Sequence, residues 1–497
     1  MAVTAPVTRT VSEHIDETGQ AGLTALQQRT WFLAAAGKFF EGMIVFLVGV
    51  ATPLIAAQYS LSTAQIGLVT AMPLLGILIG ASALGGLADK VGRRPLFLWE
   101  MGLLTACLVG VSFSNSLPIF LLFLLGTGLA LGSDYPVAHL MISETLPTKI
   151  RGRRVLAAFG FQAVGAVAGT GVGMLVLSQR EELSDWRIMF ALVIIPAFVV
   201  TIARIFTAQS PHWLASKGRY DEAEAVLAAL CFGDHKAGDL RITREAPVVD
   251  AVKADQKASQ SSIKTLFKRP LRRATILTSV PWFLQDLGTY GIGIFTPIVI
   301  ATTLGTDTTG LDDTVSGVIA SDLQGAEGAF IIDTFLLVGL AVALFLVDRV
   351  GRIRLQVVGF IGCGVGLAIA ASSVFFENPT FAIFAGFMIF NFSTNLGPNT
   401  MTYVLAGEVF PTRVRGKGAG FAASAGKVGA VLTAFLFPTL LDVWGQGVLL
   451  TVLVATSLLG AVITWKFRIN TVGMSLEQVD TGAVIEVLPA APAPRAG

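Results

Sequence analysis

Long apolar runs separated by short polar segments dominate the chain. A membrane-spanning helix needs about 20 mostly apolar residues, and such runs come in two sets of six. The first set lies near residues 30–57, 63–87, 95–113, 117–142, 153–178 and 188–207. The second lies near 274–303, 324–347, 354–374, 378–405, 418–443 and 447–468. The pattern predicts an all-α membrane protein with twelve transmembrane helices in two six-helix halves.

Polar segments flank and divide these two sets. The predicted organisation is an N-terminal segment (1–27), a first half (28–207), a central loop (208–273), a second half (274–468) and a tail (469–497). Within the central loop, residues 220–230 are predicted to form a short amphipathic helix.

Composition narrows the class of function. Of the 497 residues, 53% are hydrophobic and 14% are charged, whereas soluble domains carry roughly 25% charged residues. This composition excludes a soluble enzyme, and the net charge of +2 argues against a nucleic-acid partner. Cys107, Cys231 and Cys363 have neither disulfide nor metal-ligand spacing. Since no catalytic triad or nucleotide-binding loop stands out either, we expect no cofactor and no metal.

Basic residues gather in alternate loops. They occur after the second, fourth, eighth and tenth predicted helices, as Lys90, Arg93, Arg94, Lys149, Arg151, Arg153, Arg154, Arg349, Arg352, Arg354, Arg413, Arg415 and Lys417. Excess Lys and Arg marks the cytoplasmic side of a membrane protein. We therefore predict that both termini and the central loop are cytoplasmic, with the protein in the plasma (inner) membrane.

The two halves repeat each other in these basic loops. Asp89-Lys-Val-Gly92-Arg93 is echoed by Asp348-Arg-Val-Gly351-Arg352, and Glu144-Thr-Leu-Pro-Thr-Lys-Ile-Arg151 by Glu408-Val-Phe-Pro-Thr-Arg-Val-Arg415. Internal repeats of this kind indicate a transporter whose site lies between the halves, near the middle of the membrane.

These motifs contain acids and arginines that can pair across helix ends. Pairs that form and break as the protein opens would bias a two-state rocking motion. Eight residues are the resulting gating candidates, namely Asp89, Arg93, Glu144, Arg151, Asp348, Arg352, Glu408 and Arg415. The alternative is that they serve only as topology signals and helix caps.

Ionisable and amide side chains also lie inside the predicted helices, where they are costly and indicate function. Counting from the nearest basic loop residue at 1.5 Å per residue places Glu41, Asp286, Asn399 and Lys427 roughly 15–21 Å deep. Trp282, Asp286 and Tyr290 follow one another at intervals of four and so share one helical face. An acid between two aromatic residues at this depth favours a binding site over packing.

The paired loop motifs resemble those of the major facilitator superfamily. Pro211-His-Trp213-Leu214, just after the sixth helix, is similar to the corresponding loop in sugar-porter-related branches. The resemblance covers residues from about 28 to 468. It implies that helices one, four, seven and ten line a central cavity.

One branch is matched in more detail, the proton-coupled phosphate symporters. Its Asp-Tyr-Pro on helix four corresponds to Asp134-Tyr135-Pro136, its helix-five glutamine to Gln162, and its Trp-x-x-x-Asp-x-x-x-Tyr to Trp282, Asp286 and Tyr290. Its Gly-Pro-Asn on helix ten corresponds to Gly397-Pro398-Asn399, and its Gly-Lys on helix eleven to Gly426-Lys427.

The resemblance to this branch implies roles for these residues. The substrate-binding set would be Tyr135, Gln162, Trp282, Asp286, Tyr290, Asn399 and Lys427, with the lysine supplying positive charge. Protons would be carried by Glu41, Asp134 and Asp286.

The first helix departs from the phosphate branch, which has two aspartates there. Glu41 replaces one of them, Ile44 occupies the position of the other, and Lys38 is an additional cation. We expect Lys38 to pair with Glu41 along the helix, the alternative being a second anchor for an anion. His139 is expected to be a buried histidine with its hydrogen bonds satisfied rather than a proton relay.

The expected function is proton-coupled symport of a small anion, phosphate first, by a monomer in the lipid bilayer. Moving an anion against an inside-negative potential costs about 2.3 kcal/mol per charge per 100 mV, so uptake needs co-transported cations. One alternative is a transporter or exporter of a sugar or another organic solute. Another is a nutrient sensor that binds without transport.

Overall fold

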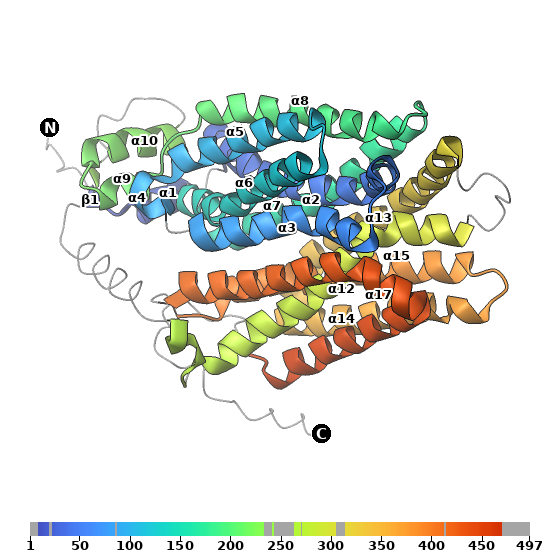
Figure 1. The fold of residues 1–497 in the computed structure, drawn as a ribbon. Coiled ribbons are helices and arrows are strands. Elements are labelled where there is room, and N and C mark those ends of the chain that lie inside the picture. The colour runs from blue at the N-terminus through green and yellow to red at the C-terminus, as the bar shows by residue number, and fades with distance from the viewer. Residues whose placement is uncertain are drawn as a thin grey trace, which may run out of the picture.

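The computed structural model describes residues 8–18, 22–84, 87–232, 241–242, 263–269, 271–304, 314–411 and 414–469. Long helices form two bundles that lie side by side, with the first half from blue to green and the second from yellow to red (Figure 1). The first half contains α2 (Ala25–Tyr59), α3 (Thr63–Leu84), α5 (Arg93–Ser112), α6 (Leu117–Thr145), α7 (Thr148–Leu177) and α8 (Trp186–Ile205). The second half contains α12 (Arg272–Leu304), α13 (Val315–Val350), α14 (Arg352–Ala371), α15 (Thr380–Leu396), α16 (Pro398–Glu408) and α17 (Arg415–Lys466).

The twelve predicted spans are all present in the described residues. By length and apolar composition, 11 helical segments qualify as spans. The last of them, α17, contains two helices, because Gly445 has a φ of 73° and breaks the helix there. Conversely, α15 and α16 form one span, interrupted at Gly397 where Pro398 has no N–H for the hydrogen-bond ladder.

A small cluster of short elements with its own apolar core covers one end of the first half. It comprises β1 (Thr8–Arg9), α1 (Val11–Thr18), α4 (Leu87–Val91), α9 (Pro211–Ser216), α10 (Tyr220–Phe232) and β2 (Arg241–Ile242). β1 and β2 pair in parallel, with Thr8 opposite Arg241. Helix α10 matches the short helix predicted from the sequence. α1 is fixed to the bundle because Asp16 Oδ1 accepts a hydrogen bond of 2.6 Å from the Thr148 N–H, at the start of α7.

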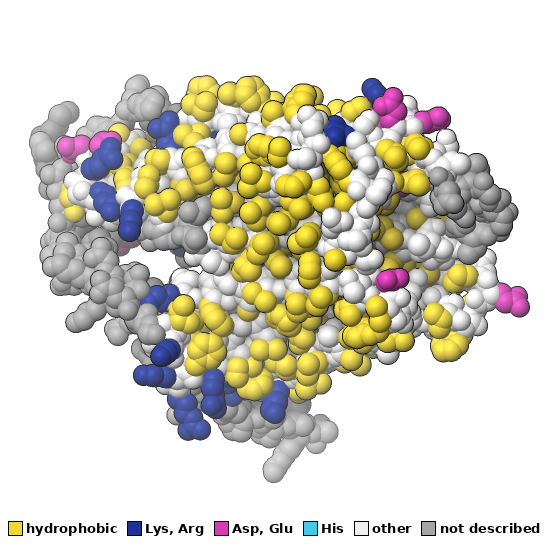
Figure 2. All heavy atoms as spheres, viewed as in Figure 1, with side chains coloured by type: hydrophobic (Ala, Val, Ile, Leu, Met, Phe, Trp, Pro, Cys, Tyr) yellow, Lys and Arg dark blue, Asp and Glu magenta, His cyan; other side chains and the backbone are white. Residues whose placement is uncertain are grey.

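The surface is that of an integral membrane protein. Apolar side chains cover the sides of the helices, while Lys and Arg gather mostly at one end and Asp and Glu at the other (Figure 2). On α8, for example, Ile195 and Val199 are 64% and 60% exposed. A large exposed apolar surface of this kind fits contact with lipid. The end that carries Arg93, Arg94, Arg349 and Arg352 is called the basic end below.

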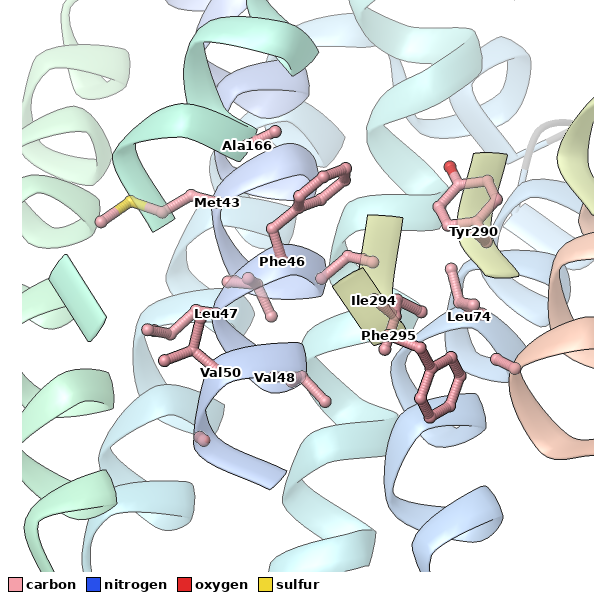
Figure 3. Packing of buried hydrophobic residues seen from close by; sticks show 14 of the residues in the cluster. Met43, Phe46, Leu47, Val48, Val50, Leu74, Ala166, Tyr290, Ile294 and Phe295 are labelled. Carbon is pink, nitrogen blue, oxygen red and sulfur yellow. The ribbon is translucent and has the colours of Figure 1, made fainter. Parts of the chain in front are cut away.

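The halves are closely packed away from the basic end. A Cβ atom on Gly49 would lie 2.3 Å from the Ile294 carbonyl oxygen, so α2 and α12 approach backbone to backbone there. Phe46 of α2 lies beside Ile294 and Phe295 of α12 in this apolar contact (Figure 3). At the basic end, by contrast, the surface is hollowed between the two halves (Figure 2).

Candidate functional site

Five of the residues singled out in the sequence meet between the two halves. They are Glu41 on α2, Gln162 on α7, Asp286 and Tyr290 on α12, and Lys427 on α17. All five are buried. The site therefore lies at the interface of the halves, as internal repeats predict, one helical turn from the apolar contact of Phe46 and Ile294.

Lys427 is the centre of this group. Its Nζ lies 3.0 Å from Glu41 Oε1 and 3.8 Å from Asp286 Oδ2. It also donates a hydrogen bond to the Tyr290 hydroxyl and lies 4.4 Å from the centroid of that ring. The Lys427 ammonium, in the second half, is thus neutralised chiefly by the Glu41 carboxylate, in the first half.

Glu41 holds a second cation with its other oxygen. Lys38 Nζ lies 2.6 Å from Glu41 Oε2, one turn earlier on α2. The expected ion pair along the first helix is present, and it shares its carboxylate with Lys427. With Asp286, the cluster contains two positive and two negative groups and is neutral overall when all are ionised.

Two oxygen atoms at the site have spare hydrogen-bonding capacity within the described part of the chain. Gln162 Nε2 donates to Tyr290 and Glu41 over 3.1 and 3.4 Å, but its Oε1 has no partner there. Asp286 Oδ2 likewise accepts no hydrogen bond and faces only the more distant Lys427. A proton or a hydrogen-bond donor from a solute could satisfy either atom.

Glycines bring the helices close enough for these contacts. A Cβ on Gly426 would lie 2.5 Å from Trp282 Cδ1, so the indole of α12 packs directly on the α17 backbone beside Lys427. A Cβ on Gly42 would lie 2.0 Å from the Gln162 carbonyl oxygen, which similarly joins α2 to α7 beside Glu41.

Asn399 belongs to a neighbouring amide network within the second half. Its Oδ1 accepts from Gln285 Nε2 over 3.2 Å, and its Nδ2 donates to Asn395 Oδ1 over 2.7 Å. Gln285 is on α12, one residue before Asp286, so the network borders the charged cluster. Tyr135 lies on α6, but its side chain is outside the described structure.

Asp134 lies in a separate buried cluster of charges, inside the first half. Arg204, on α8, donates to Asp134 Oδ1 over 2.8 Å and to Glu100 Oε1, on α5, over 2.6 Å. All three side chains are buried, with Arg204 0% exposed. Arg204 lies at the end of an apolar run and was not among the residues singled out in the sequence.

Tyr403 is a candidate that the sequence did not single out. It lies on α16, where its hydroxyl is 3.1 Å from His139 Nδ1 on α6, and its ring stacks on Phe159 of α7 at 4.4 Å. It also meets Trp282 edge-on at 6.2 Å. This aromatic group joins the halves on the basic-end side of the charged cluster, so His139 has a partner across the interface.

Four of the gating candidates pair as equivalent bridges at the basic end. Arg93 contacts Glu144 through Nε and Nη2 at 3.2 and 3.0 Å, and Arg352 Nη2 lies 3.4 Å from Glu408. Each bridge stays within its own half.

Of the other four gating candidates, two have described side chains. Asp348 Oδ1 lies 3.6 Å from Arg352 Nη1. Arg151 Nη2 donates to the Thr148 hydroxyl over 3.2 Å at the start of its own helix. The side chains of Asp89 and Arg415 are outside the described structure.

Comparison with known proteins assigns the fold and the family. The sugar (and other) transporter family matches residues 14–483. The chain belongs to the sugar (and other) transporter family. Its relatives include a putative metabolite transport protein of Escherichia coli, 25% identical over 92% of this chain and 95% of that protein. A putative inorganic phosphate transporter of Schizosaccharomyces pombe is 27% identical over 86% of this chain and 83% of its own length.

The fold is that of the major facilitator superfamily. The solved structure of the proton:xylose symporter XylE of Escherichia coli matches with a TM-score of 0.73 at 20% identity, over 93% of this chain and 99% of that one. Members of the sugar (and other) transporter family are secondary transporters. This chain is accordingly a membrane transporter and not an enzyme.

Proposed function

We propose that this transporter is a proton-coupled symporter of a small anion, with inorganic phosphate as the first choice. The observation that carries the proposal is the position of Glu41 between two buried ammonium groups, Lys38 at 2.6 Å and Lys427 at 3.0 Å. Because a carboxylate attracts cations only while it is ionised, a proton on Glu41 would weaken its attraction for both lysines together and leave Lys427 facing the more distant Asp286.

The charge count links the proton to the anion. With Glu41 and Asp286 ionised, the two lysines are balanced and the cluster has no net attraction for an anion. One proton gives the cluster a charge of +1, and two protons give +2, which complements the charge of phosphate near neutral pH. Lysine ammonium, glutamine amide and tyrosine hydroxyl groups all donate hydrogen bonds to oxyanions, and this site contains each of them.

The position of the site supports alternating access. The contact of Phe46 and Ile294 closes it on one side, and the Tyr403 group lies on the other. Following the positive-inside rule, we assign the basic end, both termini and the central loop to the cytoplasm, in the plasma membrane. In this assignment the bridges from Arg93 and Arg352 sit at the cytoplasmic gate, and the protein works as a monomer.

Relatives of the chain support a small anion as its substrate. The putative phosphate transporter of fission yeast matches along most of the chain, and the matched residues Gln162, Asp286, Tyr290 and Lys427 lie together. Asn399 borders that group, and Trp282 packs beside Lys427. Tyr135 completes the proposed substrate-binding set.

The decisive experiment measures phosphate binding by Lys427→Gln. Thermal stabilisation of the purified protein by phosphate should be clear for the wild type and largely lost in the variant, because the main cation facing the anion is gone. Lys466→Gln, an exposed lysine near the end of the second helix of α17, is the matched control and should respond like the wild type. Xylose, glucose and small organic anions are tested alongside phosphate.

Each outcome has a defined meaning. Wild-type protein that phosphate does not stabilise would remove phosphate as the substrate, and stabilisation by a sugar instead would favour the neutral-solute alternative. Retained phosphate affinity in Lys427→Gln would show that this lysine only pairs permanently with the acids.

A further inference from the structure

Asp333 is a buried acid of the second half that lies outside the charged cluster. It is on α13 and is 1% exposed. Its Oδ1 accepts a hydrogen bond of 3.0 Å from Asn391 Nδ2 on α15, and its Oδ2 lies 2.8 Å from the Thr170 hydroxyl oxygen on α7. Within the described part of the chain it makes no ion pair. Since α7 belongs to the first half, the contact with Thr170 joins the two halves.

The contacts of this carboxyl group fit its protonated form. A charge buried inside a membrane span without a cation is costly, and such a group takes up a proton instead. A protonated Asp333 can accept from Asn391 through Oδ1 and donate to Thr170 through Oδ2. The single hydrogen of the Thr170 hydroxyl is then available to the Ala166 carbonyl oxygen, 3.1 Å away. Each of the three contacts thus has one donor and one acceptor.

A second hydrogen bond joins the halves at an equivalent place. The Thr70 hydroxyl on α3 donates to the Ala434 carbonyl oxygen on α17 over 2.8 Å. Ala434 follows Thr170 by 264 residues, and Glu408 follows its repeat partner Glu144 by the same number. Thr170 and Ala434 therefore occupy equivalent positions in the two halves. The bond from Thr70 contains no ionisable group, whereas its counterpart contains Asp333.

Both bonds lie on the side of the molecule away from the basic end. Thr170 is seven residues before the last residue of α7, and Thr70 is seven residues after the first residue of α3. At 1.5 Å per residue, each is about 10 Å from that end of its helix. The halves are in close contact here, because a Cβ on Gly67 would lie 2.2 Å from the Phe435 carbonyl oxygen. Separating the halves on this side must break both bonds.

We propose that Asp333 is a further residue of the transport cycle, which holds a proton while this side is closed and releases it when the side opens. In the closed state the carboxyl group donates its hydrogen to Thr170 and is shielded from water. When α7 and α13 separate, water replaces Thr170 and can receive the proton. An ionised Asp333 then opposes closure, because its charge would have to be buried again. High pH should therefore favour the open state on this side, and low pH the closed state.

The helices packed on α13 place few titratable groups around this proton. Helix α15 contains none, and the ionisable residues of α7 are all near the basic end. Away from the basic end, the titratable groups on α2, α12, α14 and α13 itself include Lys38, Glu41, Asp286, Tyr290, Cys363, Asp322 and Glu327. The proposal goes beyond anion symport and holds for any transported solute.

Infrared spectroscopy of the purified protein tests the proton on Asp333. The wild type should show a carbonyl stretch of a protonated carboxyl group that is absent in Asp333→Asn. Thr170→Val should keep this band but shift it, because the carboxyl group loses a hydrogen-bond partner. Glu327→Gln, which changes an exposed acid on the same helix, is the control and should leave the band unchanged. A spectrum of Asp333→Asn that retains the whole wild-type band would show that Asp333 is ionised and overturn the proposal.

The link to opening is measured as the distance between spin labels on Ala64 and Glu377. These exposed residues lie in different halves, at the end opposite the basic end. The native cysteines are buried, so cysteines introduced at the two positions take the label. Thr70→Val and Thr170→Val should each raise the ratio of open to closed molecules about 2- to 10-fold, which corresponds to one hydrogen bond.

The pH dependence of the same distance separates the two bonds. In the wild type the open fraction should rise with pH, and it should rise less in Asp333→Asn. Thr70→Val should keep the wild-type pH dependence, because its bond has no ionisable group. Equal pH dependence in the wild type and Asp333→Asn would overturn the link, as would an unchanged ratio in Thr170→Val. None of these measurements requires phosphate, so their failure is distinguishable from failure of the proposed function.

Discussion

Replacing Glu41 by glutamine is the sharpest perturbation that this site allows. The substitution keeps the shape of the side chain but removes the charge shared by Lys38 and Lys427, and so imitates the protonated carboxyl group. Removing one partner of a buried ion pair costs about 3–5 kcal/mol. The variant should therefore be less stable than the wild type by about that amount when no anion is present.

Phosphate should restore much of this loss. A ligand at 100 times its Kd stabilises the native state by about 2.7 kcal/mol, and in the variant neither lysine is paired with a charge at position 41. The assay is the thermal denaturation of wild type and Glu41→Gln, with and without phosphate. Glu377→Gln, which changes an exposed acid, serves as the control and should follow the wild type.

The pH dependence of binding gives the sign of the coupling. Anion binding to the wild type requires a proton on Glu41 and should weaken as pH rises, whereas the variant has no such requirement. The ratio of variant to wild-type affinity should therefore increase with pH, and using this ratio cancels the ionisation of phosphate itself. A constant ratio, or a variant as stable as the wild type without phosphate, would refute the reasoning.

Three further predictions concern coupling and gating. Asp286→Asn should abolish accumulation of phosphate in proteoliposomes under a proton gradient while exchange continues, and normal accumulation would show that Asp286 is not a coupling residue. Arg93→Ala or Arg352→Ala should lower turnover far more than affinity in uptake kinetics, since both lie at the basic end; a loss of affinity alone would contradict a gating role. Tyr403→Phe removes the bond to His139 but keeps the ring, so backbone hydrogen exchange in α16 should accelerate about 2- to 10-fold; unchanged exchange would argue against this contact.

The helices were predictable because a bilayer imposes length and apolar composition on every span. The boundaries of the helices were less predictable from the sequence. Helix α13 begins at Val315, whereas the apolar run begins near 324, because its first turns contain the polar residues Ser316, Ser321 and Asp322. Asp322 is one of these and is 2% exposed.

That the site residues lie at a common level was also predictable, because rise per residue converts sequence distance into position along a helix. That calculation placed Glu41, Asp286 and Lys427 at one level, and the structure brings them together. It gives no information on the rotation of one helix relative to another. For that reason the partners of Asp134 could not be predicted, since they come from α5 and α8.

Tyr403 was overlooked for a related reason. A single tyrosine near the end of a helix has no distinctive spacing, and its importance arises only from contacts with His139 and Phe159 in the other half. Contacts across the halves also depend on the conformation, so no pattern within one helix can indicate them.

The lysine on the first helix changes the charge balance of the proposed cycle. Where the phosphate symporters that this chain resembles have two aspartates, it has Glu41 and Lys38. The cluster is therefore neutral before any proton binds, and a single proton makes it attractive to an anion. A cluster with the second acid and without Lys38 would need two more protons to reach the same charge. It follows that anion binding here should require fewer protons, and that the charge on Lys38 must be accommodated when Glu41 is neutral.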